Sequence, residues 1–307
     1  MYLEQLTLRL AEGLGRLPDA WRRRHAEYLL AAQRPDGGFA GREGASDLYY
    51  TSFGLRSLAL LGQLDGDPAA RATAFLKARL ADNVPIVDFL SLIYSAKMLE
   101  LAAGLDVFAA QPAGWQQSVA AALEPLRRAD GGYAKTDAGQ ASSVYHSFLV
   151  VLCQQLIKQP TPDPQKLVEF VRARRREDGG FVEMNVMKRS GTNPTAAAVG
   201  LLSIFDALDE ATRADTGEFL AEMQTDEGGL RANTRIPIAD LLSTFTGMLT
   251  LADLGQADQI DRAAARRYVD QMQLSSGGYR GAEWDPAHDV EYTFYGLGAT
   301  ALLADDV

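Results

Sequence analysis

Gly-Gly pairs recur along this chain of 307 residues at an almost constant spacing. The five pairs begin at Gly37, Gly131, Gly179, Gly228 and Gly277. The intervals are 94, 48, 49 and 49 residues, and the first is twice 47, so one unit lacks its pair near residues 81–83. A period of this length indicates stacked helical hairpins. We assign the glycines to positive φ at helix C-caps.

Two kinds of helix are expected between the glycine pairs. The segments 68–80, 165–176, 211–224 and 260–273 carry apolar residues at three- and four-residue steps, which is typical of surface helices. The runs 48–61, 241–254 and 290–303 are apolar nearly all round, which is typical of buried helices. Six polar residues open the apolar runs and are predicted N-caps: Asp47, Asp88, Ser143, Asn193, Asp240 and Asp289.

This alternation predicts an all-α fold, an α/α toroid in which about six helical hairpins place six inner helices inside six outer ones. An open stack of repeats needs polar helices at its ends, and here the first and last inner helices are as apolar as the middle ones. We therefore expect one closed domain over residues 1–307, with the N-termini of the inner helices around a central cavity.

Composition excludes several classes of protein. The net charge of −10 disfavours a nucleic acid or an anionic membrane as a broad partner, although a local basic cluster is compatible with an anion at one small site. The single cysteine, Cys153, excludes an intrachain disulfide and a Cys-rich zinc site. No apolar run is long enough for a membrane span, and no signal peptide is recognisable, so we expect a cytoplasmic protein.

Three repeat segments carry a family resemblance: DGGFAGREGASDLYYTSFGLRSLALLGQL, EGGLRANTRIPIADLLSTFTGML and SGGYRGAEWDPAHDVEYTFYGLGATALL. They resemble the β subunits of protein prenyltransferases, in particular geranylgeranyltransferase type II, and class II terpene cyclases carry related repeats. The resemblance extends from about His25 to Leu303. It implies an isoprenoid diphosphate as ligand and a helical-repeat protein as partner subunit.

The resemblance also implies a zinc site, made of an Asp and a Cys that open the fifth inner helix and a His at the start of the sixth. In this chain Asp240 matches the aspartate, but Leu242 stands at the cysteine position and Tyr292 at the histidine position. Leucine has no donor atom and tyrosine is a rare ligand, so zinc of the usual kind is not expected. His288 with Asp289 and Glu291, or His146 with Cys153, are alternative metal-binding sets.

Catalytic residues are sought at the same helix starts. Asp240, Asp289, Glu291 and Tyr292 are the candidates. The D-x-D-D motif that class II terpene cyclases use for protonation does not occur, and neither does D-D-x-x-D. Asp88 or Asp240 would serve as an acid only if burial raised its pKa.

Basic and aromatic residues supply the remaining candidates. For a diphosphate we select loop residues Arg42, Lys188, Arg189, Arg231 and Arg235, whose alternative role is to pair with nearby carboxylates. For the cavity we select Tyr49, Tyr50, Tyr145, His146, Phe245 and Trp284, whose alternative role is plain core packing. Two functions stay open: an enzyme that transfers or cyclises a prenyl group, and a toroid that binds an isoprenoid, a lipid or a protein without catalysis.

Overall fold

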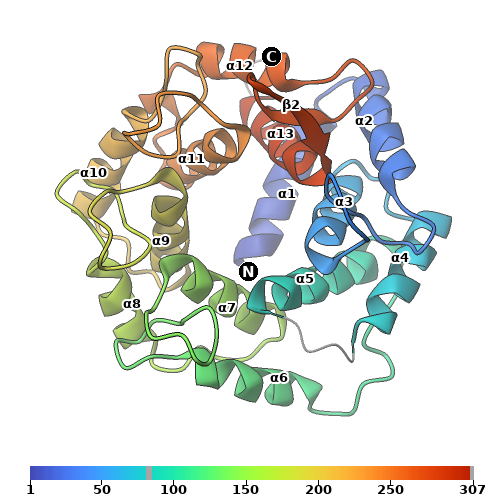
Figure 1. Ribbon diagram of the computed structural model, residues 1–307, viewed down its shortest axis with the longest axis horizontal. Helices are drawn as coiled ribbons and strands as arrows, with labels where there is room; N and C mark the ends of the chain where they lie inside the picture. Colours follow the sequence, from blue (N-terminus) through green and yellow to red (C-terminus); the bar gives the residue numbers. More distant parts are fainter. Residues whose placement is uncertain (81–84, 305–307) are drawn as a thin grey trace. The chain divides into compact units, whose positions relative to one another are not determined.

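The computed structural model describes residues 1–80 and 85–304 (Figure 1). The segment 81–83, where the repeat lacks its glycine pair, lies outside the described residues. The helices are α1 (Tyr2–Gly15), α2 (Asp19–Ala32), α3 (Leu48–Leu60), α4 (Gly66–Ala78), α5 (Ile86–Ala103), α6 (Trp115–Leu123), α7 (Val144–Leu156), α8 (Pro164–Arg172), α9 (Thr192–Ile204), α10 (Glu210–Ala221), α11 (Leu241–Asp253), α12 (Arg262–Met272) and α13 (Val290–Leu303). Two 3-10 turns lie at Glu124–Leu126 and Ala257–Gln259.

The chain forms two compact units. The first contains Leu3–Trp115 and the segment from Gln271 onward, and the second contains Gln116–Asp270. In the first unit the apolar helices α13, α3 and α5 pack side by side in that order, with α2 against α3 and α4 against α5. In the second unit α7, α9 and α11 pack in the same way, with α8 against α9 and α10 against α11. The single-domain organisation expected for residues 1–307 stays a prediction.

Four of the six predicted N-caps are confirmed. Asp47, Ser143, Asp240 and Asp289 each accept a hydrogen bond from the backbone N–H three residues later. The other two predictions are wrong. Pro85 caps α5, so that Asp88 lies inside its first turn, and Gly191 caps α9, so that Asn193 is already helical.

A β-hairpin precedes the last apolar helix, where the sequence predicted only a loop. Strand β1 (Tyr279–Ala282) pairs antiparallel with β2 (Asp285–Asp289), and Tyr279 lies opposite Asp289. The hairpin delivers the chain directly into the N-cap of α13. No described helix is long and apolar enough to cross a membrane.

The positive φ assigned to the glycine pairs is confirmed at the first glycine of each pair, but the pairs lie in turns after the covering helices, so their placement at the helix C-caps was wrong. Helix α2 ends at Ala32, and Gly37 follows in a turn with φ of 88° whose N–H donates to the Arg34 carbonyl. A Cβ atom on Gly37 would lie 2.2 Å from the carbonyl oxygen of Arg71 in α4, and one on Gly38 would lie 2.7 Å from the Phe75 ring. The pair is therefore required because the next covering helix packs directly on the turn.

A buried hydroxyl connects each of these turns to the next apolar helix. In the five repeats that carry a glycine pair, the fourth residue after the N-cap is Ser or Thr, and its oxygen accepts the backbone N–H of the bulky residue that follows the glycines. The pairs are Thr51 with Phe39, Ser147 with Tyr133, Thr195 with Phe181, Thr244 with Leu230 and Thr293 with Tyr279. Sequence analysis missed this contact, although the hydroxyl recurs with the repeat.

Replacing Thr244 by Val tests this contact. Valine keeps the shape but leaves the buried N–H of Leu230, now 2.9 Å from the hydroxyl oxygen, without an acceptor. We expect the free energy of unfolding to fall by about 1–3 kcal/mol, measured by urea denaturation. Thr136→Val at an exposed position is the control and should change stability little. Equal effects of the two substitutions would contradict a structural role for the hydroxyl.

His25 replaces a carboxylate in the last turn of the repeat. In three earlier turns an aspartate, such as Asp36, accepts the N–H of the second glycine, whereas Ser276 stands at that position here. The N–H of Gly278 instead donates to Nδ1 of His25, 3.0 Å away, and Nε2 donates to the side-chain oxygen of Gln273. Burial, helped by the charge of Arg24, lowers the pKa of His25 to about 3.

Acid should therefore destabilise the fold through His25. Its pKa is near 6.5 when unfolded and about 3 when folded, so the unfolded state binds the extra proton between these values. The contribution of neutral His25 to the free energy of unfolding is fully present above pH 6.5 and is lost as the pH decreases toward 3. The loss is up to about 1.4 kcal/mol per pH unit. Denaturation of His25→Asn across this range should show a shallower slope than wild type. His288→Asn, which changes an exposed histidine, should retain the wild-type slope.

Candidate functional site

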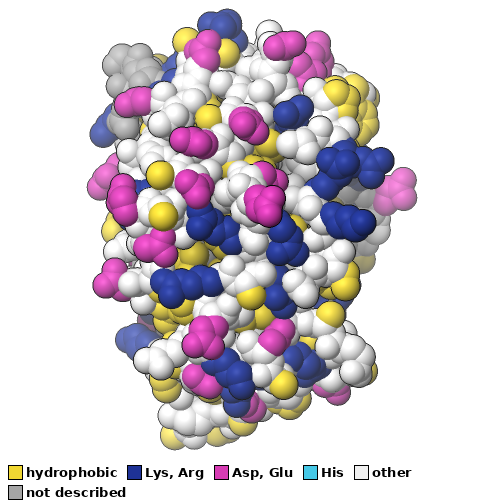
Figure 2. All heavy atoms as spheres, turned by 90° about the vertical axis from the view of Figure 1, so that its left-hand side faces the viewer, with side chains coloured by type: hydrophobic (Ala, Val, Ile, Leu, Met, Phe, Trp, Pro, Cys, Tyr) yellow, Lys and Arg dark blue, Asp and Glu magenta, His cyan; other side chains and the backbone are white. Residues whose placement is uncertain are grey.

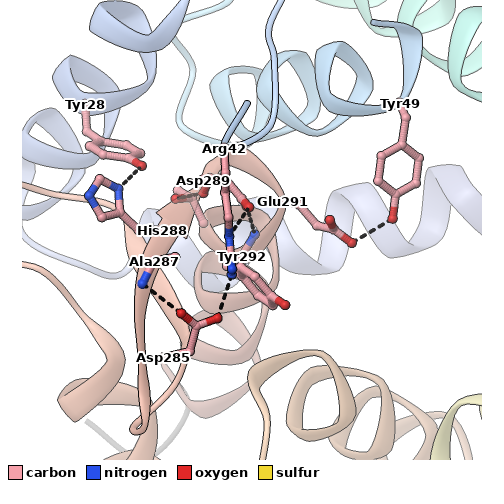
Figure 3. A network of polar contacts seen from close by, with 10 residues as sticks. Tyr28, Arg42, Tyr49, Asp285, Ala287, His288, Asp289, Glu291 and Tyr292 are labelled. Atoms are coloured by element: carbon pink, nitrogen blue, oxygen red, sulfur yellow. Dashed lines mark hydrogen bonds and ion pairs between the residues drawn. The ribbon is translucent and has the colours of Figure 1, made fainter. Parts of the chain in front are cut away.

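The first turns of α3 and α13 meet in the first unit and form the candidate site (Figure 3). Asp47 caps α3 and Asp289 caps α13. Two residues after these caps stand Tyr49 in α3 and Glu291 in α13. Side chains of a first turn point toward the helix N-terminus, so residues at this position extend from the helix start. The Tyr49 hydroxyl donates a 2.6 Å hydrogen bond to Oε1 of Glu291.

Glu291 is a half-buried carboxyl that two tyrosine hydroxyls contact. The hydroxyls of Tyr49 and Tyr295 both donate to Oε1, at 2.6 and 3.1 Å, whereas Oε2 accepts no hydrogen bond from any described residue. Burial raises the pKa of Glu291, and the negative charge of Asp289 acts in the same direction, against the hydrogen bond from Tyr49. The raised pKa makes the protonated carboxyl more accessible than in an exposed glutamate, and the two hydroxyls can stabilise the carboxylate that remains after a proton is transferred.

Aromatic rings surround this acid. Phe53 lies 5.0 Å from Tyr49, 5.4 Å from Tyr295 and 5.5 Å from Phe294, measured between ring centroids. The guanidinium of Arg56 lies 3.8 Å from the centroid of Phe294 and makes no hydrogen bond or ion pair within residues 1–80 and 85–304. Such rings attract positive charge through their π faces, and the guanidinium of Arg56 already lies over Phe53 and Phe294.

Arg42, a predicted diphosphate ligand, is engaged by carboxylates of the hairpin. Its Nη2 donates to Asp285 at 2.8 Å, its Nε lies 3.7 Å from Asp289, and its guanidinium carbon is 5.5 Å from the centroid of the Tyr292 ring. A backbone hydrogen bond from Ala287 and the interaction with Arg42 lower the pKa of Asp285. Arg42 thus joins the loop before α3 to the hairpin before α13, and a diphosphate role for it stays a prediction.

The alternative metal set of His288, Asp289 and Glu291 does not form. Nδ1 of His288 is 2.8 Å from the Tyr28 hydroxyl, Asp289 caps α13, and Glu291 accepts from tyrosines (Figure 3). Within the described part of the chain, no three His, Cys, Asp or Glu residues are grouped as a metal site would require. The other set fails as well, since Cys153 is fully buried and its thiol pKa is raised by that burial.

The family's zinc site is not matched by its donor atoms. Both carboxylate oxygens of Asp240 accept from Ser243, Oδ1 from the backbone N–H at 2.7 Å and Oδ2 from the hydroxyl at 2.8 Å. Leu242 offers no ligand atom at the next family position. Burial raises the pKa of Asp240, against the hydrogen bonds from Ser243. Both carboxylate oxygens of Asp240 are thus used to cap α11, and the donor atoms around it do not fit a zinc ion.

The remaining basic candidates lie in two loops of the second unit. Arg231 donates from Nη2 to the carbonyl oxygen of Glu222 at the end of α10. Lys188, Arg189 and Arg235 are exposed and make no ion pair with any described residue. These loops leave the three cations available to solvent.

The predicted cavity residues differ in their surroundings. Tyr49 belongs to the acid site, while Tyr50 packs against Gly41, where a Cβ atom would lie 2.5 Å from its ring. Phe245 is buried in α11, and Trp284 and Tyr145 are 67% and 41% exposed.

A second polar cluster, which sequence analysis did not assemble, contains His146. The hydroxyl of Ser143 lies 2.8 Å from its Nδ1 and also donates to Glu183, whose carboxylate accepts the N–H of Tyr145. Burial raises the pKa of Glu183 and lowers that of His146. Because Glu183 is about 40 residues from this helix start, only the neighbouring repeat's fold brings it there.

The sequence matches the prenyltransferase alpha-alpha toroid domain over residues 14–87 and 91–307. The chain belongs to this family. The α/α toroid fold class predicted from the repeats is thereby confirmed. Among curated protein sequences, none matches the chain.

Solved structures share the fold at low sequence identity. Protein geranylgeranyltransferase-I of Candida albicans, complexed with GGPP, is 16% identical, with a TM-score of 0.71 over 92% of this chain and 90% of that one. A type II terpene cyclase variant from Scytonema, in complex with geranylgeranyl dihydroxybenzoate, is 14% identical, with a TM-score of 0.66 over 99% and 100%. A glycosidase is 14% identical, with a TM-score of 0.56 over 98% and 97%. One fold therefore serves different chemistries.

The role of Asp240 can be tested directly. Asp240→Ala should lower the free energy of unfolding by about 1 kcal/mol through loss of the N-cap, with or without a zinc chelator. Asp47→Ala, which removes an equivalent cap, is the matched control. Stoichiometric zinc in the purified protein, or a melting temperature that chelation lowers only when Asp240 is present, would contradict this assignment.

Proposed function

We propose that this protein cyclises or isomerises an isoprenoid by protonating one of its alkenes, with Glu291 as the acid. The observation that carries the proposal is a half-buried carboxyl of raised pKa that accepts hydrogen bonds from two tyrosine hydroxyls and lies beside aromatic rings. The membership in a toroid family and the likeness to a terpene cyclase support an isoprenoid as the substrate class. The donor set at Asp240 and Leu242 disfavours zinc-dependent transfer to a cysteine.

The reaction balances without a cofactor. Oε2 of Glu291 gives its proton to one alkene carbon, a C–H bond forms, and a tertiary carbocation remains on the neighbouring carbon. The carboxylate left behind is stabilised by hydrogen bonds from Tyr49 and Tyr295, and the cation by the rings around Phe53. A second alkene can attack this cation, which forms a C–C bond and moves the positive charge to another carbon. In either case loss of a proton from a carbon next to the cation forms the final alkene. One proton is gained and one is lost, so the product is an isomer of the substrate, and the Glu291 carboxylate takes up a proton from water before the next turnover.

Incubation of the protein with geranylgeranyl diphosphate in D2O tests this proposal. Mass spectrometry should show an isomeric product in which one deuterium has been incorporated, without release of pyrophosphate. Glu291→Gln cannot supply the proton and should lower the rate by about 100-fold or more. Because the acid must be protonated, the rate should fall as the pH rises through the raised pKa of Glu291.

Glu283→Gln is the matched control, since Glu283 is exposed in the turn of the same hairpin. It should keep the wild-type rate. An unchanged rate in Glu291→Gln would place the acid elsewhere. Tight binding of the prenyl compound by wild type without conversion would instead support the non-catalytic isoprenoid-binding function. The helical partner subunit and the diphosphate roles of Lys188, Arg189, Arg231 and Arg235 stay predictions.

A further inference from the structure

Two adjacent loops of the second unit combine exposed aliphatic side chains with cations. We call residues 184–190 and 231–239, which precede α9 and α11, the docking loops. Val186 is 84% exposed, Met187 and Ile236 are each 40% exposed, and Ile238 is 37% exposed. These are four of the eight large apolar residues with high exposure in the described chain, so the exposure is concentrated rather than scattered.

The docking loops are also locally basic. They contain Lys188, Arg189, Arg231 and Arg235 and no Asp or Glu, in a chain whose net charge is −10. The nearest carboxylates in sequence, Glu183 and Asp240, are bound at the starts of α7 and α11. Figure 2 shows one face of the molecule, on which Lys and Arg side chains lie among apolar and acidic ones. The docking loops are therefore positively charged, although the chain as a whole has a negative net charge.

Hydrogen bonds hold each loop in a fixed form. The first residue of α9, Thr192, binds the second loop, since its N–H donates to the carbonyl of Ala232 at 2.9 Å and its hydroxyl donates to the carbonyl of Arg231 at 2.6 Å. Arg176 donates to the carbonyl oxygens of Asn185 and Met187, at 3.1 and 3.2 Å. The apolar side chains are therefore presented to solvent by an ordered backbone.

We propose that the docking loops bind the surface of an anionic lipid bilayer. Aliphatic side chains enter the boundary between headgroups and acyl chains, while Lys and Arg beside them bind the phosphates. The exposed apolar residues of these loops include no aromatic side chain, which is the type most enriched at the centre of protein interfaces, and Lys188, of a type depleted there, lies among them. Acidic groups more distant than about 8 Å from the bilayer are screened at physiological salt, so the local positive charge prevails.

Flotation of the full chain with lipid vesicles tests this proposal. Vesicles of phosphatidylcholine and phosphatidylglycerol should bind the protein, and pure phosphatidylcholine vesicles should bind it far more weakly. Lys188→Glu with Arg189→Glu should lower the partition coefficient by at least about 30-fold, and rising salt should weaken wild-type binding. Ile236→Ser with Ile238→Ser should also reduce binding, without removing its salt dependence.

The control carries the same change of charge at another surface. Lys158 and Lys166 are exposed near the end of α7 and in α8 of the same unit, and their replacement by Glu should leave binding unchanged. Circular dichroism of each variant checks that it is folded. Equal loss of binding in this control, or no flotation with either vesicle, would overturn the proposal. So would displacement of the protein from mixed vesicles by inorganic pyrophosphate at constant ionic strength, since the loops would then be a site for a small anion.

Discussion

The contact on which each repeat depends is the hydrogen bond from a buried backbone N–H to a Ser or Thr hydroxyl. Its donor is the bulky residue after the glycines, and its acceptor lies one turn into an apolar helix, as Thr293 does for Tyr279. Because an unpaired buried N–H is costly, this bond fixes the turn relative to the helix start. The backbone of the N-cap and of the two residues after it is therefore held in place, whichever side chains those two residues carry.

That constraint explains why one position of the repeat can change its chemistry. The second residue after the N-cap is Tyr49 in α3, Tyr145 in α7, Leu242 in α11 and Glu291 in α13. The cap itself is needed to satisfy the first N–H groups of the helix, so Asp240 and Asp289 carry their hydrogen bonds whatever reaction occurs nearby. A side chain two residues after the N-cap is not needed to satisfy these N–H groups. Glu291 can therefore accept hydrogen bonds from the tyrosine hydroxyls and carry a proton.

The sequence predicted what is local and repeated. Period, helix type and four N-caps depend on residues within one turn, whereas Pro85 and Gly191 displaced the other two caps by backbone preferences that polarity alone does not reveal. Glu291 was found as a candidate, but its partner Tyr49 lies 242 residues earlier in the chain. Likewise, nothing near Gly278 indicates that His25 replaces the missing aspartate, since only the tertiary fold brings them together.

Net charge misleads for the same reason, because it averages over surfaces that act separately. Arg42 is surrounded by Asp285 and Asp289, so its charge is largely compensated where it lies. Lys188 and Arg189 are as basic in sequence, but they are exposed and make no ion pair with any described residue. Interactions with an anion fall off within about a Debye length. The contribution of a Lys or Arg side chain to anion binding therefore depends on the charged groups close to it in the folded structure. The net charge of the chain describes neither of these two sites.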